Sequence, residues 1–220
     1  MSTSTFNIEF ADRLNELPPY LFVEIDKAKR AAVAAGRDVI NLGIGDPDQP
    51  TPKYIVDAMI EAVKDGNNHH YALDAGLPAL RQEIARWFEN RFTVKLNSDN
   101  EIYPLIGSKE GLAHLPLGII NPKDKVLLTD PSYPAYRPSL QFAGAKIVSV
   151  PIKASNDFIP DLDKIRDYKD IKAIVINYPN NPTAAVATRE FYEGLVKIAH
   201  EKGIIIVLDM AYAEVYYDRQ

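Results

Sequence analysis

The sequence predicts an α/β protein with a mainly parallel sheet, helices on both faces of the sheet, and a helical arm at the N-terminus. Short apolar runs rich in β-branched residues alternate along the chain with segments of helical periodicity. The most apolar runs, residues 173–176 and 204–208, have no alternating polar positions. That pattern is typical of parallel strands that are covered by helices on both sides.

The predicted elements begin with an amphipathic helix over residues 20–35, which ends at Gly36. Thr51 and Pro52 predict the start of a second helix, and Gly66 its end. Further helices are expected over residues 78–92, 109–120, 136–143 and 188–202, and strands over residues 101–106, 125–130, 145–150, 171–178 and 204–209.

Composition excludes several classes of protein. With 220 residues, 46% of them hydrophobic, the chain is long enough for a substantial core. A net charge of -5 with scattered basic residues predicts no nucleic-acid partner. The longest apolar run is too short to cross a bilayer and no leader pattern opens the chain, so we expect a cytoplasmic protein without membrane contact.

The residue types also limit the chemistry. No cysteine is present, which excludes disulfides and thiolate chemistry, and the four histidines lack the spacing of zinc ligands. We therefore predict no metal site.

Unusual residues follow the predicted strands, where open α/β sheets bind their ligands. Gly107, Ser108 and Lys109 form a glycine turn that opens into a helix and suits a phosphate, although a plain helix cap is an alternative. Tyr133 lies between prolines after the strand at 125–130 and is able to stack on a flat ring or simply pack in the core.

The last two strands end in polar residues. NYPNNPT, residues 177–183, is a rigid loop with amide donors, and Asp209 ends the most apolar strand, with Tyr212 three residues later. A buried carboxylate is costly without a cationic partner, and a protonated pyridine nitrogen would be one. The phenolic oxygen of such a ring would accept hydrogen bonds from Asn181 and Tyr212.

Six motifs, in this order along the chain, resemble the class I and II aminotransferases of fold type I, which use pyridoxal 5'-phosphate. They are LGIGDP at residues 42–47, YALDAGLPALR at 71–81, GSKEG at 107–111, DPSYPAY at 130–136, NYPNNPT at 177–183 and DMAY at 209–212. Residues 20–29 and 107–136 are further similar to LL-diaminopimelate aminotransferases.

This resemblance implies a role for each matching residue. Asp209 would keep the pyridine nitrogen protonated, so that the ring accepts electrons from the substrate carbon, and Tyr212 and Asn181 would contact the phenolic oxygen. Tyr133 would stack on the ring. The resemblance assigns the cofactor phosphate to Gly107, Ser108, Lys109 and, from the neighbouring subunit, Tyr71, and it assigns the substrate to Tyr20, Gly45 and Asp74.

The resemblance also implies a homodimer with composite active sites and an incomplete chain. Residues 1–36 would form the arm and helix on the small-domain side, and residues 37–220 the N-terminal part of the large cofactor-binding domain. The lysine that holds the cofactor covalently in this family follows the Asp209 strand, and no lysine occurs after Asp209 here. Lys109 is a poor substitute, because it lies at the phosphate end of the predicted site.

Two further departures bear on the substrate. Ala184 replaces the usual glycine after Asn-Pro-Thr, and Asp74 stands near the position of a glutamate in diaminopimelate enzymes. We expect a full-length enzyme of lysine biosynthesis that moves an amino group from LL-2,6-diaminopimelate to a 2-oxo acid such as 2-oxoglutarate. The alternatives are a broader aspartate, alanine or aromatic aminotransferase and an inactive binding module; the 220-residue chain alone is expected to be inactive.

Overall fold

The computed structural model describes residues 9–17, 19–43, 45, 47–71 and 75–217. Its contacts divide the chain into two compact units. Residues 1–24 and 106–220 form the first, here called the sheet unit, and residues 25–105 form the second, the helical unit. The division into an arm up to residue 36 and a large domain from residue 37 stays a prediction.

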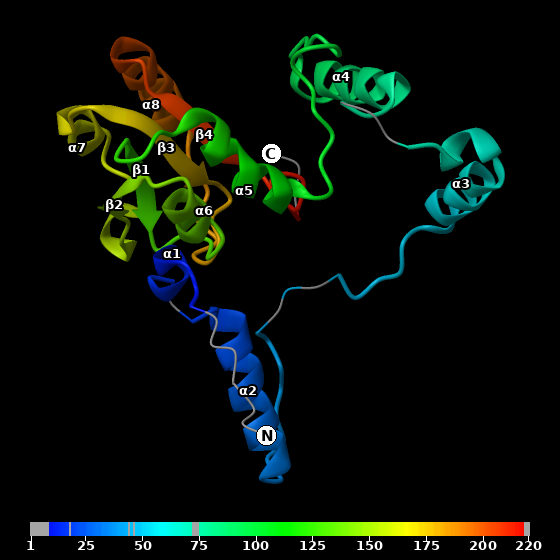
Figure 1. The fold of residues 1–220 in the computed structure, drawn as a ribbon, viewed down its shortest axis with the longest axis horizontal. Helices are drawn as coiled ribbons and strands as arrows, with labels where there is room; N and C mark the ends of the chain where they lie inside the picture. Colours follow the sequence, from blue (N-terminus) through cyan, green and yellow to red (C-terminus); the bar gives the residue numbers. More distant parts are fainter. Residues whose placement is uncertain (1–8, 18, 44, 46, 72–74, 218–220) are drawn as a thin grey trace, which may run out of the picture. The chain divides into compact units, whose positions relative to one another are not determined.

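The sheet unit contains four parallel strands (Figure 1). They are β1 (Lys125–Asp130), β2 (Lys146–Pro151), β3 (Ile171–Asn177) and β4 (Ile205–Asp209). Their order in the sheet is β2-β1-β3-β4, so β1 and β3 lie in the middle. The parallel sheet predicted from the apolar runs is confirmed.

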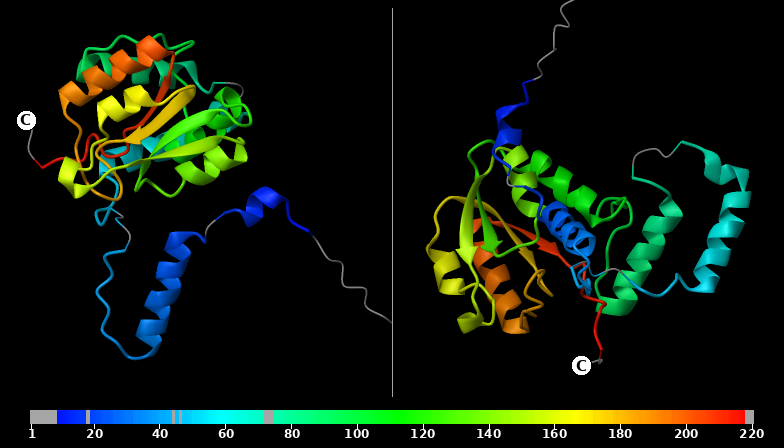
Figure 2. Two further views of the ribbon diagram at one scale, coloured as in Figure 1. Left: turned by 90° about the vertical axis from the view of Figure 1, so that its left-hand side faces the viewer. Right: turned by 90° about the horizontal axis from the view of Figure 1, so that it is seen from below.

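Helices cover both faces of this sheet, as predicted (Figure 2). One face carries α5 (Ser108–Ile119) and α6 (Tyr136–Phe142), and the other carries α7 (Leu162–Asp167) and α8 (Arg189–Lys202). Successive residues of one strand enter opposite cores: Ile174 packs with α7 and α8, and Val175 with α6. Strands with two buried faces have no polar alternation, which explains their continuous apolar sequence.

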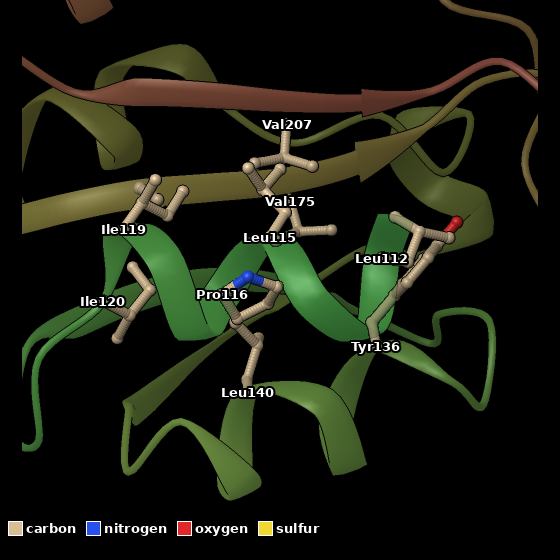
Figure 3. A pocket seen from close by; sticks show the side chains of 10 residues that line it. Leu112, Leu115, Pro116, Ile119, Ile120, Tyr136, Leu140, Val175 and Val207 are labelled. Carbon is tan, nitrogen blue, oxygen red and sulfur yellow. The ribbon is translucent and has the colours of Figure 1, made fainter. Parts of the chain in front are cut away.

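The core between α5, α6 and the sheet encloses a small apolar cavity of about 20 Å³ (Figure 3). Leu112 and Pro116 of α5, Leu140 of α6 and Val175 of β3 line it, together with the ring of Tyr136. A space of this size with an apolar lining is a packing gap in the core and not a ligand site.

The helical unit and the N-terminal residues contain no strand in the parts that the structure describes. Their elements are α1 (Asp12–Asn15), α2 (Leu21–Ala34), α3 (Lys53–Lys64), the 3₁₀ turn η1 (Gly66–His69) and α4 (Pro78–Phe92); a second 3₁₀ turn, η2 (Ala154–Asn156), belongs to the sheet unit. The helices predicted over residues 20–35 and 78–92 are confirmed to within one residue.

Two local predictions are wrong. Residues 101–106 form no strand, because a strand needs a partner and none pairs with this segment within the described ranges. Thr51 does not cap α3, which begins at Lys53 with Pro52 at its N-cap position and without a side-chain cap. By contrast, Thr188 caps α8 by accepting a hydrogen bond from the backbone N–H of Phe191.

Across the described ranges, no helix is both long and apolar enough to cross a membrane. In the same part of the chain, histidine and carboxylate side chains nowhere gather in groups of three that would ligate a metal.

Candidate functional site

The carboxyl ends of β1, β3 and β4 and the start of α5 surround a cavity of about 250 Å³. Because the strands are parallel, the loops that follow them all leave from the same edge of the sheet. The cavity is lined by Gly107, Ser108, Lys109, Tyr133, Tyr136, Asn177, Asn181, Asp209, Ala211 and Tyr212. The structure thus brings together seven of the eight residues that the sequence assigns to a cofactor; the eighth is Tyr71.

Asp209 ends β4 as a buried carboxylate with 9% of its surface exposed. Its Oδ2 accepts a hydrogen bond of 2.7 Å from the hydroxyl of Tyr136, and its Oδ1 accepts one of 3.2 Å from the backbone N–H of Ala211. Burial, followed by the bond to Asp209, raises the pKa of Tyr136 far above its ordinary value, so this hydroxyl keeps its proton. Each carboxylate oxygen can accept a further bond, which leaves Asp209 able to pair with a cation.

Asn181 and Tyr212 come from the loops after β3 and β4 and meet at the cavity. The Nδ2 of Asn181 lies 3.1 Å from the hydroxyl of Tyr212. The backbone N–H of Asn181 donates to the Oδ1 of Asn177 at 2.7 Å, and the Nδ2 of Asn177 donates to the backbone oxygen of Asp209 at 2.9 Å. The side chains of Asn181 and Tyr212, which the sequence predicts to contact the same phenolic oxygen of a bound ring, therefore lie side by side.

Gly107 forms the turn before α5, with φ 79° and ψ 148° at the N-cap position. L-residues rarely adopt this conformation, so glycine suits the turn although space for a Cβ is available. The first turn of a helix leaves backbone N–H groups without intrahelical partners, and its dipole favours anions. The start of α5 at Ser108 can therefore hold a phosphate at the rim of the cavity.

Lys109 adds a cation to this turn. Its Nζ lies 5.6 Å from the centroid of the Tyr133 ring, within the range of a cation–π contact. A hydrogen bond with Tyr133 is the main cause that raises the pKa of Lys109, and Tyr20 adds smaller effects in the same direction. Lys109 is thus a cation at neutral pH, which suits phosphate binding and disfavours the neutral amine that Schiff-base formation requires.

Tyr20 is not among the residues that line the cavity, and Gly45 and Tyr71 belong to the other unit. Tyr20 belongs to the sheet unit, is 47% exposed and contacts the ring of Phe22. Gly45 and Tyr71 are exposed residues of the helical unit, and Asp74 lies outside the described residues. Their contacts with substrate and cofactor stay predictions.

Sequence reasoning missed three residues that line the cavity: Tyr136, Asn177 and Ala211. Tyr136 and Asn177 lie inside the motifs DPSYPAY and NYPNNPT, but nothing in those motifs shows which tyrosine or asparagine faces Asp209. A search for neutral donors able to satisfy the buried carboxylate would have included Tyr136.

Ala184 has a left-handed backbone conformation, with φ 59°, in the loop that carries Asn181. For a residue other than glycine this conformation costs roughly 1–2 kcal/mol. We expect Ala184→Gly to raise the free energy of unfolding by about 0.5–1 kcal/mol, since the strain it removes exceeds the extra chain entropy of glycine. Urea unfolding of the full-length protein measures this, and lower stability would contradict it. Ala185→Gly is the matched control and should destabilise, because Ala185 has no positive φ.

The donor set fits pyridoxal phosphate. A flat ring with a basic nitrogen needs a carboxylate, its phenolic oxygen needs hydrogen-bond donors, and its phosphate needs a helix N-terminus and a cation. Asp209, the pair of Asn181 and Tyr212, and the turn at Gly107 supply these groups around one cavity.

Comparison with known proteins identifies the family. The profile of aminotransferase class I and II matches residues 37–220. The chain is 50% identical to LL-diaminopimelate aminotransferase of Maridesulfovibrio salexigens over 212 residues, which cover 96% of this chain and 55% of that protein. It is also 50% identical, over 210 residues, to the protein of the same name from Aquifex aeolicus, which covers 94% of this chain and 54% of that protein.

Among solved structures, a double mutant of Thermus thermophilus aspartate aminotransferase superposes with a TM-score of 0.89 at 29% identity; the match covers 97% of this chain and 56% of that one. The chain spans about half the length of the curated relatives that it matches. The sequence motifs, the cavity and the family profile agree: the chain belongs to the class I and II aminotransferases, whose members depend on pyridoxal phosphate.

Proposed function

We propose that the full-length protein is an aminotransferase that moves an amino group from an amino acid to a 2-oxo acid by two half-reactions. One observation carries this proposal: a single cavity at the strand ends presents a buried carboxylate, an amide–phenol pair and a cationic glycine turn. The family membership and the relatives' names support the same activity.

When bound, pyridoxal phosphate supplies a protonated ring that takes up the electrons released at the substrate's α-carbon. Asp209 holds the proton on the pyridine nitrogen, because its negative charge stabilises the charged form of that nitrogen. Tyr136 and Ala211 hold the carboxylate in place from both oxygens. Asn181 and Tyr212 orient the phenolic oxygen by hydrogen bonds.

The other residues of the cavity bind and orient. The turn of Gly107 and Ser108 and the ammonium of Lys109 bind the phosphate, and the ring of Tyr133 covers one face of the cofactor. In the proposed homodimer, Tyr71 of the neighbouring subunit adds a phosphate contact, so each active site is composite. The residues after Asp209 contain no lysine. We therefore do not assign the covalent attachment of the cofactor to any residue of this chain.

LL-diaminopimelate is the amino donor that we propose, with 2-oxoglutarate as acceptor and a place in lysine biosynthesis. The support is the name shared by relatives that are about 50% identical over nearly the whole chain. Tyr20, Gly45 and Asp74 are the proposed substrate contacts. Solved relatives named aspartate and alanine aminotransferase make a broader donor range the alternative.

The test uses purified full-length protein and a panel of donors that contains LL-diaminopimelate, glutamate, aspartate, alanine and phenylalanine. Conversion of the bound cofactor to its amine form is followed by absorbance for each donor. We expect the fastest conversion with LL-diaminopimelate. If only donors other than LL-diaminopimelate convert the cofactor, the proposed substrate is wrong and the proposed aminotransferase activity is supported.

Absence of conversion with every donor would exclude the five donors of the panel as substrates. Borohydride reduction followed by mass measurement then separates two remaining states of the protein. A covalent phosphopyridoxyl adduct indicates an enzyme with an untested substrate, and bound cofactor without an adduct indicates a binding module.

A further inference from the structure

Asn177 is the last residue of β3 and has 2% of its surface exposed. Its side chain uses both of its polar atoms at this position. Nδ2 donates to the backbone oxygen of Asp209 at 2.9 Å, and Oδ1 accepts from the backbone N–H of Asn181 at 2.7 Å. One buried amide therefore joins two residues that line the cavity: Asp209 at the end of β4 and Asn181 in the loop after β3.

The position of Asn177 at the end of β3 explains why a side chain connects Asp209 with Asn181. The pairing of β3 with β4 ends at Asn177 and Asp209, which are partners in the register. Beyond these two residues the segments that follow β3 and β4 form different loops, and no strand pairing holds the two segments together. The side-chain amide of Asn177 links the two segments where the pairing of β3 with β4 ends.

We propose that Asn177 is a positioning residue that fixes the spacing between Asp209 and Asn181. The proposal rests on the proposed function, in which Asp209 contacts the pyridine nitrogen and Asn181 contacts the phenolic oxygen of the same rigid ring. A ring held at two points binds well only if the distance between those points is correct. Asn177 sets that distance because its side chain bonds to the backbone of both residues.

The chemistry of the bridge requires an amide of this length. It needs one donor and one acceptor on two separate atoms at the end of a short side chain, which an asparagine amide supplies and a serine or threonine hydroxyl, with both functions on one oxygen, does not. Aspartate keeps the acceptor for Asn181 and loses the donor to Asp209. Alanine loses both and leaves two polar backbone groups without this partner.

Asn180 offers a matched control in the same loop. It is also buried, with 4% of its surface exposed, and its Nδ2 donates to the hydroxyl of Thr183 at 2.8 Å. Replacing Asn180 removes a buried amide of the same kind but leaves the bridge to Asp209 intact. A general loss of loop packing affects both asparagine variants, and a loss of positioning affects only the Asn177 variant.

The experiment measures the dissociation constant of pyridoxal phosphate by absorbance titration of the cofactor-free full-length protein. We expect Asn177→Ala to raise this constant by about 10-fold, since the contacts of Asp209 and Asn181 with the ring both weaken when their spacing changes. Asn180→Ala should raise it much less. The midpoint of thermal unfolding, measured without cofactor, reports the loss of stability alone. It should fall by similar amounts in both variants, so that a difference in cofactor binding cannot come from stability.

A double-mutant cycle tests whether Asn177 acts through Asn181. We expect Asn177→Ala to weaken cofactor binding less when Asn181→Ala is already present, because one of the two positioned contacts is then gone. Equal effects in both backgrounds, or equal effects of Asn177→Ala and Asn180→Ala, would overturn the proposal.

If Asn177→Ala does not fold, the nearly isosteric pair Asn177→Asp and Asn180→Asp replaces it. A larger rise in the dissociation constant for Asn177→Asp than for Asn180→Asp supports positioning, and equal values overturn it. Failure of the unmodified full-length protein to bind pyridoxal phosphate is a different result. It would remove the proposed function itself.

Discussion

Asp209→Asn is expected to lower the rate of amino-group transfer by the full-length protein by at least about 10²-fold to 10³-fold, while pyridoxal phosphate still binds. The amide has the size of the carboxylate, and its oxygen can still accept the hydrogen bond from Tyr136, although its nitrogen cannot accept the bond from the backbone N–H of Ala211. What it loses is the negative charge that keeps a proton on the pyridine nitrogen. The phosphate contacts at Gly107 and Lys109 are unchanged, so binding is affected less than catalysis.

The measurement is kcat/KM with the best donor, together with the dissociation constant of the cofactor. Asp130→Asn is the matched control, because Asp130 ends strand β1 of the same sheet as an exposed carboxylate that does not line the cavity. It should leave both values close to those of the unmodified protein. A rate within a few-fold of normal for Asp209→Asn would show that Asp209 does not have the proposed role.

Lys109→Met is expected to weaken the binding of pyridoxal phosphate by about 10-fold to 100-fold, the effect of losing one charge-assisted hydrogen bond of roughly 1.5–3 kcal/mol. The methionine side chain has a similar length and can still cover the ring of Tyr133, so the charge is the main loss. Lys146→Met is the control, since Lys146 is an exposed lysine at the start of β2, whereas the cavity lies at the carboxyl ends of the strands. It should bind the cofactor as the unmodified protein does.

This prediction has a specific pH dependence. Interaction with Tyr133 raises the pKa of Lys109 above the usual 10.5. A raised pKa means that the charge is present below that value and is lost only as the pH rises through it. The ratio of the dissociation constants of Lys109→Met and the unmodified protein should therefore stay constant across the neutral and mildly alkaline range. A ratio that falls toward one near neutral pH would show that Lys109 is not the phosphate's cation.

Much of the fold was predictable because buried parallel strands leave a direct mark on the sequence. Residues 173–176 are apolar without interruption, since both faces of β3 are covered. The segment at residues 101–106 shows the limit of this reasoning. Its sequence is compatible with a strand, but strand formation depends on a partner elsewhere in the chain, and single segments carry no information about pairing.

The candidate site was predictable to the extent that it follows from topology. Once the strands are parallel, their carboxyl ends meet, and the polar residues after each strand meet with them. The partners of Asp209 were not predictable in the same way. Tyr136 lies 73 residues away in the sequence and reaches Asp209 from the first residue of α6, a helix that packs against α5, β1 and β2. The bridge formed by Asn177 depends on side-chain orientation at the end of a ladder, which no motif specifies.

Tyr136 has one further consequence, for protein engineering. Its ring forms part of the apolar core beneath α5 (Figure 3). Its hydroxyl donates a hydrogen bond to the Asp209 carboxylate. Substitutions of Leu112 or Leu140 that fill the small gap in this core would move the ring and, with it, the hydroxyl. Attempts to increase thermal resistance by repacking this region would therefore alter catalytic turnover as well, and libraries that vary these positions need to be screened for both properties together.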